Sequence, residues 1–125
     1  MRLWNQELIP HLPRAQLLGQ HRECCALRGL GWGKKHSVVA YVFQYSPFRV
    51  WAYHSLVMAE MWRRGYHVGE CWVDPSYRGL NCAPWGVEVM EEQINADRIY
   101  PEHDESHLAD DIDNLASKGV ACSVI

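Results

Sequence analysis

The apolar positions of this chain recur at helical spacing in three segments. The first covers residues 14–28: it follows Pro13, a residue that the first turn of a helix tolerates, and it ends at Gly29. The apolar stripe of this segment is formed by Leu17, Leu18, Cys24, Cys25 and Leu27. Because polar residues fill much of the remaining surface, the pattern predicts a helix that is buried on one side only.

The second segment has the clearest helix signals. Ser46 is a favourable N-cap, Pro47 suits the first helical position, and Gly65 is a natural stop. The positions that recur at helical spacing between them are Val50, Trp51, His54, Val57, Met58 and Met61. We expect this to be the central helix of the fold.

The third segment covers residues 105–117, with Asp104 as its cap and Gly119 after its end. Leu108, Ile112 and Leu115 form its apolar stripe, and we expect Asp110, Asp111 and Asp113 to lie on other faces.

The rest of the chain is less regular. Residues 84–96 could form a fourth helix, although Gly86 weakens it, and residues 69–79 are expected to be loop. Little alternation of apolar and polar residues argues for a sheet. The pattern therefore predicts an all-α fold: one compact domain over residues 1–125, with three helices, or four, and long connecting loops.

Composition agrees with one domain outside the membrane. The chain has 125 residues, of which 48% are hydrophobic, and no uncharged apolar run is long enough to span a bilayer. Its first residues lack the apolar stretch of a secretory signal, so we expect a cytoplasmic protein with no membrane partner. The five cysteines are odd in number and include no C-x-x-C pair, which favours reduced and mostly buried thiols.

Charge is divided unevenly between the two halves of the chain. Residues 1–65 hold nine Lys and Arg against three Glu, whereas residues 66–125 hold three Lys and Arg against twelve acids. A polyanion such as DNA would be attracted by the first half and repelled by the second. The alternative is a solvated surface of uneven composition.

Four stretches of sequence follow one another in an order typical of one family. They are Leu17-Leu18-Gly19-Gln20-His21-Arg22-Glu23, then Lys34-Lys35-His36, then Ser46-Pro47 through Met61-Trp62-Arg63-Arg64-Gly65-Tyr66, and last Ile99-Tyr100-Pro101-Glu102-His103. In this order the chain resembles the pyrimidine-dimer DNA glycosylases of the phage endonuclease V type, over about residues 1–118.

This resemblance implies a DNA repair glycosylase that is also an abasic-site lyase. Such an enzyme flips a nucleotide out of damaged double-stranded DNA and attacks its sugar with the α-amine of its own first residue, forming an imine, and it needs no cofactor. The implied catalytic residues are Met1 and Glu23. The family's chain begins with threonine, but here Arg2 follows Met1 directly and should prevent removal of the methionine.

The resemblance also implies a set of DNA contacts and a monomeric protein. The DNA-binding residues would be Arg2, Arg22, Arg28, Lys34, Lys35 and His36. Two family positions differ, since Gln16 replaces a histidine and Ala26 replaces an arginine.

Metal binding is the weaker alternative for the histidines. His103 and His107 have a spacing that can hold a metal, but the motif is not H-E-x-x-H, and His21 with Cys24 and Cys25 would need a distant fourth ligand. We therefore predict no metal. A second class of function stays open: a nucleic-acid-binding or regulatory protein that keeps the helical fold and has no catalysis.

Overall fold

The computed structural model describes residues 2–34, 37–90 and 98–120 of the chain. This part contains three α-helices, α1 (Arg14–Arg28), α2 (Pro47–Arg63) and α3 (Glu105–Ser117). Four 3-10 helices accompany them: η1 (Gln6–His11), η2 (Ser37–Gln44), η3 (Glu70–Val73) and η4 (Val87–Met90). No strand occurs among the described residues, so the all-α prediction is confirmed.

The three α-helices begin and end at the local signals that the sequence contains. The Ser46 side chain accepts a hydrogen bond from the Phe48 N–H at 3.1 Å at the start of α2, and Asp104 caps α3 in the same way. At the end of α2, Gly65 has a φ of 82° and the Tyr66 N–H donates to the Met61 carbonyl at 2.8 Å. This left-handed glycine closes the helix and satisfies carbonyls that would otherwise lack partners.

The sequence analysis described the connections incompletely. Residues 69–79 are not all loop, because η3 lies within them. The 3-10 helices η1 and η2 were not predicted. In the proposed fourth helix, residues 84–96, the described part forms only the short η4, and residues 91–97 lie outside the described residues.

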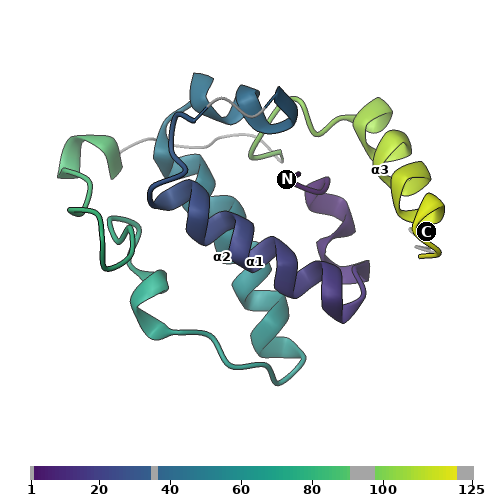
Figure 1. Cartoon of the computed structure of the whole chain (residues 1–125), viewed down its shortest axis with the longest axis horizontal. Coiled ribbons are helices and arrows are strands. Elements are labelled where there is room, and N and C mark those ends of the chain that lie inside the picture. The colour runs from purple at the N-terminus through teal and green to yellow at the C-terminus, as the bar shows by residue number, and fades with distance from the viewer. Residues whose placement is uncertain (1, 35–36, 91–97, 121–125) are drawn as a thin grey trace.

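The core lies between α1 and α2 and is closed by the N-terminal segment and η2. In Figure 1, α1 crosses in front of α2, while the segment leading into η1 runs between these helices and α3. The fully buried apolar side chains include Leu3, Leu8, Leu17, Leu27, Val39, Val42, Val50, Tyr53, Val57 and Leu115. Residues 2–12 are therefore part of the packed structure.

The four described cysteines, Cys24, Cys25, Cys71 and Cys82, are free thiols. Only Cys24 is buried and Cys71 is exposed, so the expectation of mostly buried thiols was wrong. Burial raises the pKa of the Cys25 thiol to about 11, which keeps it protonated near neutral pH. Among the described residues no helix is long and apolar enough to span a membrane.

Candidate functional site

A buried glutamine of α1 holds the backbone at the start of the chain. The Gln20 side chain is 2% exposed; its Nε2 donates to the Arg2 carbonyl at 2.9 Å and its Oε1 accepts from the Trp4 N–H at 2.7 Å. The Tyr53 hydroxyl, from α2, lies 2.8 Å from the same Oε1 and also reaches the Trp4 carbonyl. Burial raises the pKa of Tyr53, so this hydroxyl stays a donor.

A buried carboxylate of α3 holds the same segment from the other side. Asp111 Oδ1 accepts from the Arg2 guanidinium at 2.7 Å, and its Oδ2 accepts from the Asn5 N–H at 2.7 Å. Asp111 is fully buried, whereas the Arg2 side chain is 30% exposed. The expectation that Asp111 lies away from the apolar stripe of α3 was wrong, because the residue faces the segment that it binds.

A polar pocket opens beside this docked segment. It has a volume of about 270 Å³ and is lined by Arg2, Trp4, Gln16, Gly19, Gln20, Arg22, Glu23 and Lys118. The pocket thus joins one face of α1, the N-terminal segment and the end of α3. The structure brings together three of the residues that the sequence singled out, Arg2, Arg22 and Glu23.

Glu23 is the half-buried carboxylate of this pocket. Its Oε2 atom is buried and has no hydrogen-bond partner in the part of the chain that the structure describes. A carboxylate in that condition is unfavourable unless a donor or a cation reaches it. The pocket is therefore suited to bind a positively charged or proton-donating group next to Glu23.

Three cationic side chains surround the pocket. Arg22 is exposed, and its guanidinium lies over Gly19, where an added Cβ would meet it at 3.7 Å. Arg2 and Lys118 both lie against the Trp4 ring, at 5.3 and 5.2 Å from its centre. Lys118 had no place in the sequence-based site, because no local pattern connects the end of α3 to α1.

Other predicted site residues do not join the pocket. Lys34 is exposed but is not among the residues that line it. Met1, Lys35 and His36 lie outside the described residues. Trp32, which lies between Gly31 and Gly33, packs edge-on against Phe43 with 5.0 Å between the ring centres.

Arg28 is a structural residue, and the prediction that it binds DNA was wrong. It is fully buried, and its guanidinium donates to the carbonyls of Trp72, Asp74 and Tyr77 at 2.6–3.0 Å. The same guanidinium lies 2.9 Å from Nδ1 of His54. These contacts engage both terminal nitrogens of the guanidinium and tie the loop after α2 to the end of α1. Because the side chain is fully buried, Arg28 has no surface to offer a phosphate.

His21, Cys25 and His54 form a cluster that resembles a metal site. His21 Nδ1 lies 2.8 Å from His54 Nε2, and Cys25 Sγ lies 3.8 Å from His21 Nε2. This replaces the predicted grouping with Cys24 by one that includes a residue of α2. Arg28 donates to Nδ1 of His54, so the proton of the neutral imidazole is on Nε2. Nε2 is the nitrogen that faces His21 and Cys25, and a protonated nitrogen cannot bind a metal.

Burial and the positive charge of Arg28 also argue against a cation in the same cluster. Burial, then the charges of Arg28 and His21, lower the pKa of His54 to about 2. The cluster is thus a neutral hydrogen-bond chain that runs from Arg28 through His54 to His21.

His103 and His107 serve the packing of the N-terminal segment. His103 is buried; its Nδ1 accepts from the Gln6 N–H at 3.2 Å and its Nε2 lies 2.7 Å from the Tyr41 hydroxyl. The two imidazole rings stack at 4.5 Å between centres. With both of its nitrogens engaged, His103 has no free ligand atom for the metal that its spacing to His107 had suggested.

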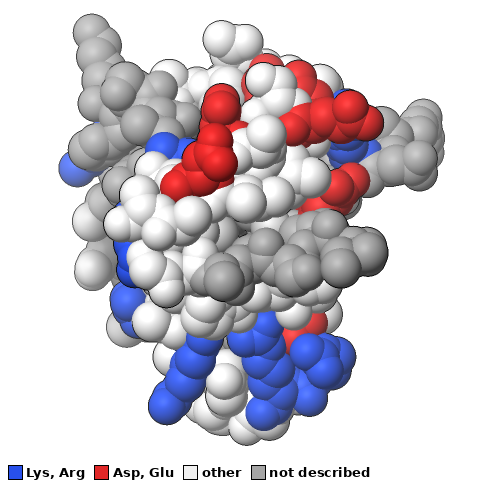
Figure 2. Space-filling view, turned by 90° about the vertical axis from the view of Figure 1, so that its right-hand side faces the viewer, with Lys and Arg blue, Asp and Glu red and all other residues white. Residues whose placement is uncertain are grey.

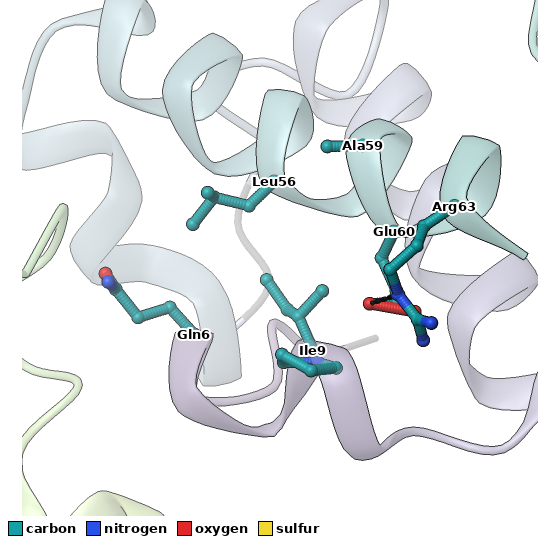
Figure 3. Close-up of a pocket in the computed structure, with 7 residues that line it drawn as sticks. Gln6, Ile9, Leu56, Ala59, Glu60 and Arg63 are labelled. Carbon is teal, nitrogen blue, oxygen red and sulfur yellow. Dashed lines mark hydrogen bonds and ion pairs between the residues drawn. The ribbon is translucent and has the colours of Figure 1, made fainter.

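A second cavity of about 210 Å³ lies between η1 and α2 and is mostly apolar. Figure 3 shows Ile9 of η1 pointing toward α2, with Glu60 and Arg63 together at one end. Its lining contains neither Glu23 nor Arg22. This cavity offers no charged group for chemistry beyond an ion pair that is already made.

The uneven charge of the sequence is visible on the surface. On the face that carries α3, Figure 2 shows acidic side chains gathered in the upper part and Lys and Arg side chains at the lower end. The exposed acids of α3 and its cap are Asp104, Glu105, Asp110 and Asp113. Lys118, at the opposite end of α3, is the basic residue that this helix contributes to the polar pocket.

One of the comparisons with known proteins gives a match, to a family model. No curated protein and no solved structure matches the chain. A family model described as pyrimidine dimer DNA glycosylase matches residues 1–74, more than half of the chain. The match includes α1 and α2 with Arg22 and Glu23, and it ends before α3 with Asp111 and Lys118. The chain therefore belongs to the pyrimidine dimer DNA glycosylase family.

Proposed function

We propose that this protein cleaves the bond between a base of a pyrimidine dimer and its deoxyribose in double-stranded DNA, and then cuts the strand at the abasic site. Membership in the pyrimidine dimer DNA glycosylase family supports the substrate and the first reaction. The polar pocket with Glu23, Arg22 and Arg2 supports the location. The protein acts as a monomer and without a cofactor.

The nucleophile is the α-amine of residue 1. An α-amine has a pKa of about 7.7–8.0, so a useful fraction is unprotonated near pH 7, whereas an ordinary lysine is almost fully charged. Arg2 lines the pocket, and the Cα of residue 1 is about 3.8 Å from that of Arg2 by covalent geometry alone. The proposal rests on this connectivity, since Met1 lies outside the described residues.

The reaction proceeds in two steps at the deoxyribose. The amine attacks C1′ while the bond from C1′ to the base breaks, and the base leaves with the electron pair and takes up a proton. The attacking nitrogen then loses a proton, the C1′–O4′ bond of the sugar ring breaks and O4′ takes up a proton, which leaves an imine at C1′. A proton-accepting group then removes a proton from C2′, and β-elimination expels the 3′ phosphate.

Glu23 assists both steps, and its geometry is the main support for the proposal. Its buried Oε2 has no partner among the described residues, and it lies in the pocket that Arg2 lines. A carboxylate there stabilises the positive charge that develops on the sugar and transfers protons to and from the intermediate.

The basic side chains hold the DNA backbone around this centre. Arg22 is free to bind a phosphate, and Lys118 lies across the same pocket. Arg2 is partly committed to Asp111, so its remaining donors contact the strand at the lesion. Lys34, which does not line the pocket, contacts a further phosphate, as do Lys35 and His36.

Borohydride trapping tests the chemistry directly. The protein is mixed with duplexes that contain one abasic site, one thymine dimer or no lesion, at pH values from 6 to 9, and any imine is reduced to a stable adduct. We expect an adduct with both damaged duplexes, mapped by mass spectrometry to the α-amine of residue 1. Absence of an adduct over the whole pH range would overturn the imine mechanism.

Two variants separate chemistry from binding. Glu23→Gln keeps the size of the side chain, and we expect it to bind damaged DNA normally while trapping is lost. A variant with two residues added before Met1 keeps Glu23 but moves the amine, and it should also lose trapping. Tight binding of wild-type protein to dimer-containing DNA with no cleavage of a glycosidic bond would instead identify a non-catalytic binding protein.

A further inference from the structure

We infer that Gln20 is a positioning residue for the reaction, acting by fixing the backbone that carries the α-amine. This inference rests on the proposed function of the same pocket. Gln20 touches neither DNA nor the reacting atoms in this scheme. Its role is to determine where residue 1 leaves the packed segment relative to Glu23.

The hydrogen bonds of Gln20 define the path of the segment residue by residue. One amide group binds the carbonyl of Arg2 and the N–H of Trp4, at 2.9 and 2.7 Å, which is how a neighbouring strand would bind an extended backbone. Rotating the amide by 180° would place donor against donor and acceptor against acceptor. The orientation of Gln20 is therefore fixed by the segment, and the segment by Gln20.

The hydrogen bonds of Gln20 to Arg2 and Trp4, called the Gln20 clamp below, come from a buried side chain and are therefore hard to break. Gln20 is 2% exposed and Tyr53 is fully buried, and the Tyr53 hydroxyl lies 2.8 Å from the Gln20 Oε1. Water cannot replace these partners at low cost, because the groups would first have to be opened to solvent. Gln20 thus holds the Arg2 carbonyl, on the far side of the Arg2 Cα from the peptide bond that joins Arg2 to residue 1.

The Gln20 clamp and the proposed catalytic carboxylate stand on the same helix. Gln20 and Glu23 are three residues apart on α1, so they are neighbours on one face and both line the polar pocket. A rigid helix thus sets the spacing between the segment that bears the amine and the group that assists it. Small errors in such a spacing reduce rates strongly, since a displacement of 1 Å can cost about 100-fold.

The sequence gives a reason for this arrangement to matter in this chain. Arg2 and Trp4 are bulky, and Trp4 lies between the cations of Arg2 and Lys118. Met1 lies outside the described residues, so the backbone leading to it is defined by the groups that hold Arg2 and Trp4. The backbone must therefore be placed by neighbours, and Gln20 is the side chain that binds it nearest to residue 1 among the described residues.

The test compares Gln20→Met, which keeps the size of the side chain but loses both hydrogen bonds, with Val57→Ala. Val57 is fully buried on α2 and lines neither cavity described above, so its variant controls for lost stability alone. For strand cleavage at an abasic site, well below the melting temperature, we expect Gln20→Met to lower kcat by about 10- to 100-fold with KM within about twofold. Val57→Ala should change neither constant.

A second measurement does not depend on catalysis. Reductive methylation with ¹³C-formaldehyde labels the α-amine and the lysines, and NMR at varied pH separates the α-amine from the lysines by its titration. In wild-type protein we expect an α-amine signal distinct from that of an unfolded peptide, and Gln20→Met should move the signal toward the peptide. If Gln20→Met fails to fold, Gln20→Glu, which keeps the acceptor for Trp4, replaces it in both measurements.

The outcomes distinguish this inference from the proposed function. If wild-type protein forms no imine but the amine signal moves in Gln20→Met, the proposed chemistry fails and the positioning stands. If imine forms normally and Gln20→Met behaves like Val57→Ala in kcat and in the amine signal, the positioning role is overturned.

Discussion

Asp111 and Arg2 stand at opposite ends of the sequence, and their side chains meet at 2.7 Å. The carboxylate is fully buried and also accepts from the Asn5 N–H, so one residue of α3 neutralises a charge and caps a backbone donor of the N-terminal segment. This contact attaches α3, which lies beyond the family-matched residues, to the wall of the polar pocket.

Asp111→Asn should destabilise the protein. The substitution keeps an acceptor but removes the negative charge opposite Arg2, and breaking a buried pair costs about 3–5 kcal/mol when both partners are buried. Because Arg2 is partly exposed, we expect about 2–3 kcal/mol less free energy of unfolding, measured by urea denaturation. Asp113→Asn, at an exposed position of the same helix, is the control and should change stability by less than about 0.5 kcal/mol. Equal stabilities of the two variants would contradict the role of Asp111.

Arg28 and Arg22 should respond in opposite ways to substitution. Arg28→Met leaves three partly buried carbonyls without their donor, so we expect a loss of about 3 kcal/mol of stability. Arg22→Gln removes an exposed charge and should leave stability within about 0.5 kcal/mol while weakening DNA binding. Thermal unfolding and fluorescence anisotropy with labelled duplex measure the two effects. Normal stability of Arg28→Met would show that its burial is not structural.

Lys118 should contribute one phosphate contact. Lys118→Gln is expected to reduce the slope of log K against log salt for binding of dimer-containing DNA by about 0.9. Arg63→Gln is the matched control, since Arg63 lines the apolar cavity of Figure 3 and pairs with Glu60. The slope for that variant should equal the wild-type slope. An unchanged slope in Lys118→Gln would remove Lys118 from the interface.

Gly19→Ala should raise stability and lower activity. Glycine inside a helix costs about 1 kcal/mol relative to alanine, and the added methyl would meet the Arg22 guanidinium at 3.7 Å, an ordinary contact. The methyl also narrows the pocket that Gly19 lines, so we expect kcat/KM for abasic-site cleavage to fall about tenfold, equivalent to about 1.4 kcal/mol. If activity rises together with the melting temperature, the glycine has no role in the pocket.

Stability should decrease as the pH falls below about 6.5, the pKa of an unfolded histidine. Burial lowers the folded-state pKa of His54 to about 2 and that of His103 to about 3. Between those values and 6.5 the unfolded chain binds protons that the folded chain excludes, so each histidine removes about 1.4 kcal/mol per pH unit. The free energy of unfolding should be highest above pH 6.5. By pH 5 the two histidines together should lower it by about 4 kcal/mol.

Urea denaturation between pH 7.5 and 5 measures this loss. His103→Gln should reduce the slope of stability against pH, while His67→Gln, at an exposed position, should leave it unchanged. A flat profile in wild-type protein would show that the buried histidines are not held neutral.

Features that depend on neighbouring residues could be predicted from the sequence. Ser46, Pro47 and Asp104 place the starts of α2 and α3, because a cap needs only the backbone of the next turn. Arg22 and Glu23 could be proposed as a site from their place in an ordered series of motifs, and the family match over residues 1–74 includes both positions.

The partner of each polar side chain depends on the tertiary structure. Asp111 was expected on a solvent-facing side of α3 because it is charged, and it is buried because its partner Arg2, 109 residues away in the sequence, lies against it. Arg28 and Gln20 are also buried, although the sequence pattern of α1 predicts a helix exposed on one side. Each is buried because its side chain donates hydrogen bonds to backbone carbonyls of a distant segment. Burial of a polar group is favourable only when such partners are present, and their presence follows from how the chain folds in space.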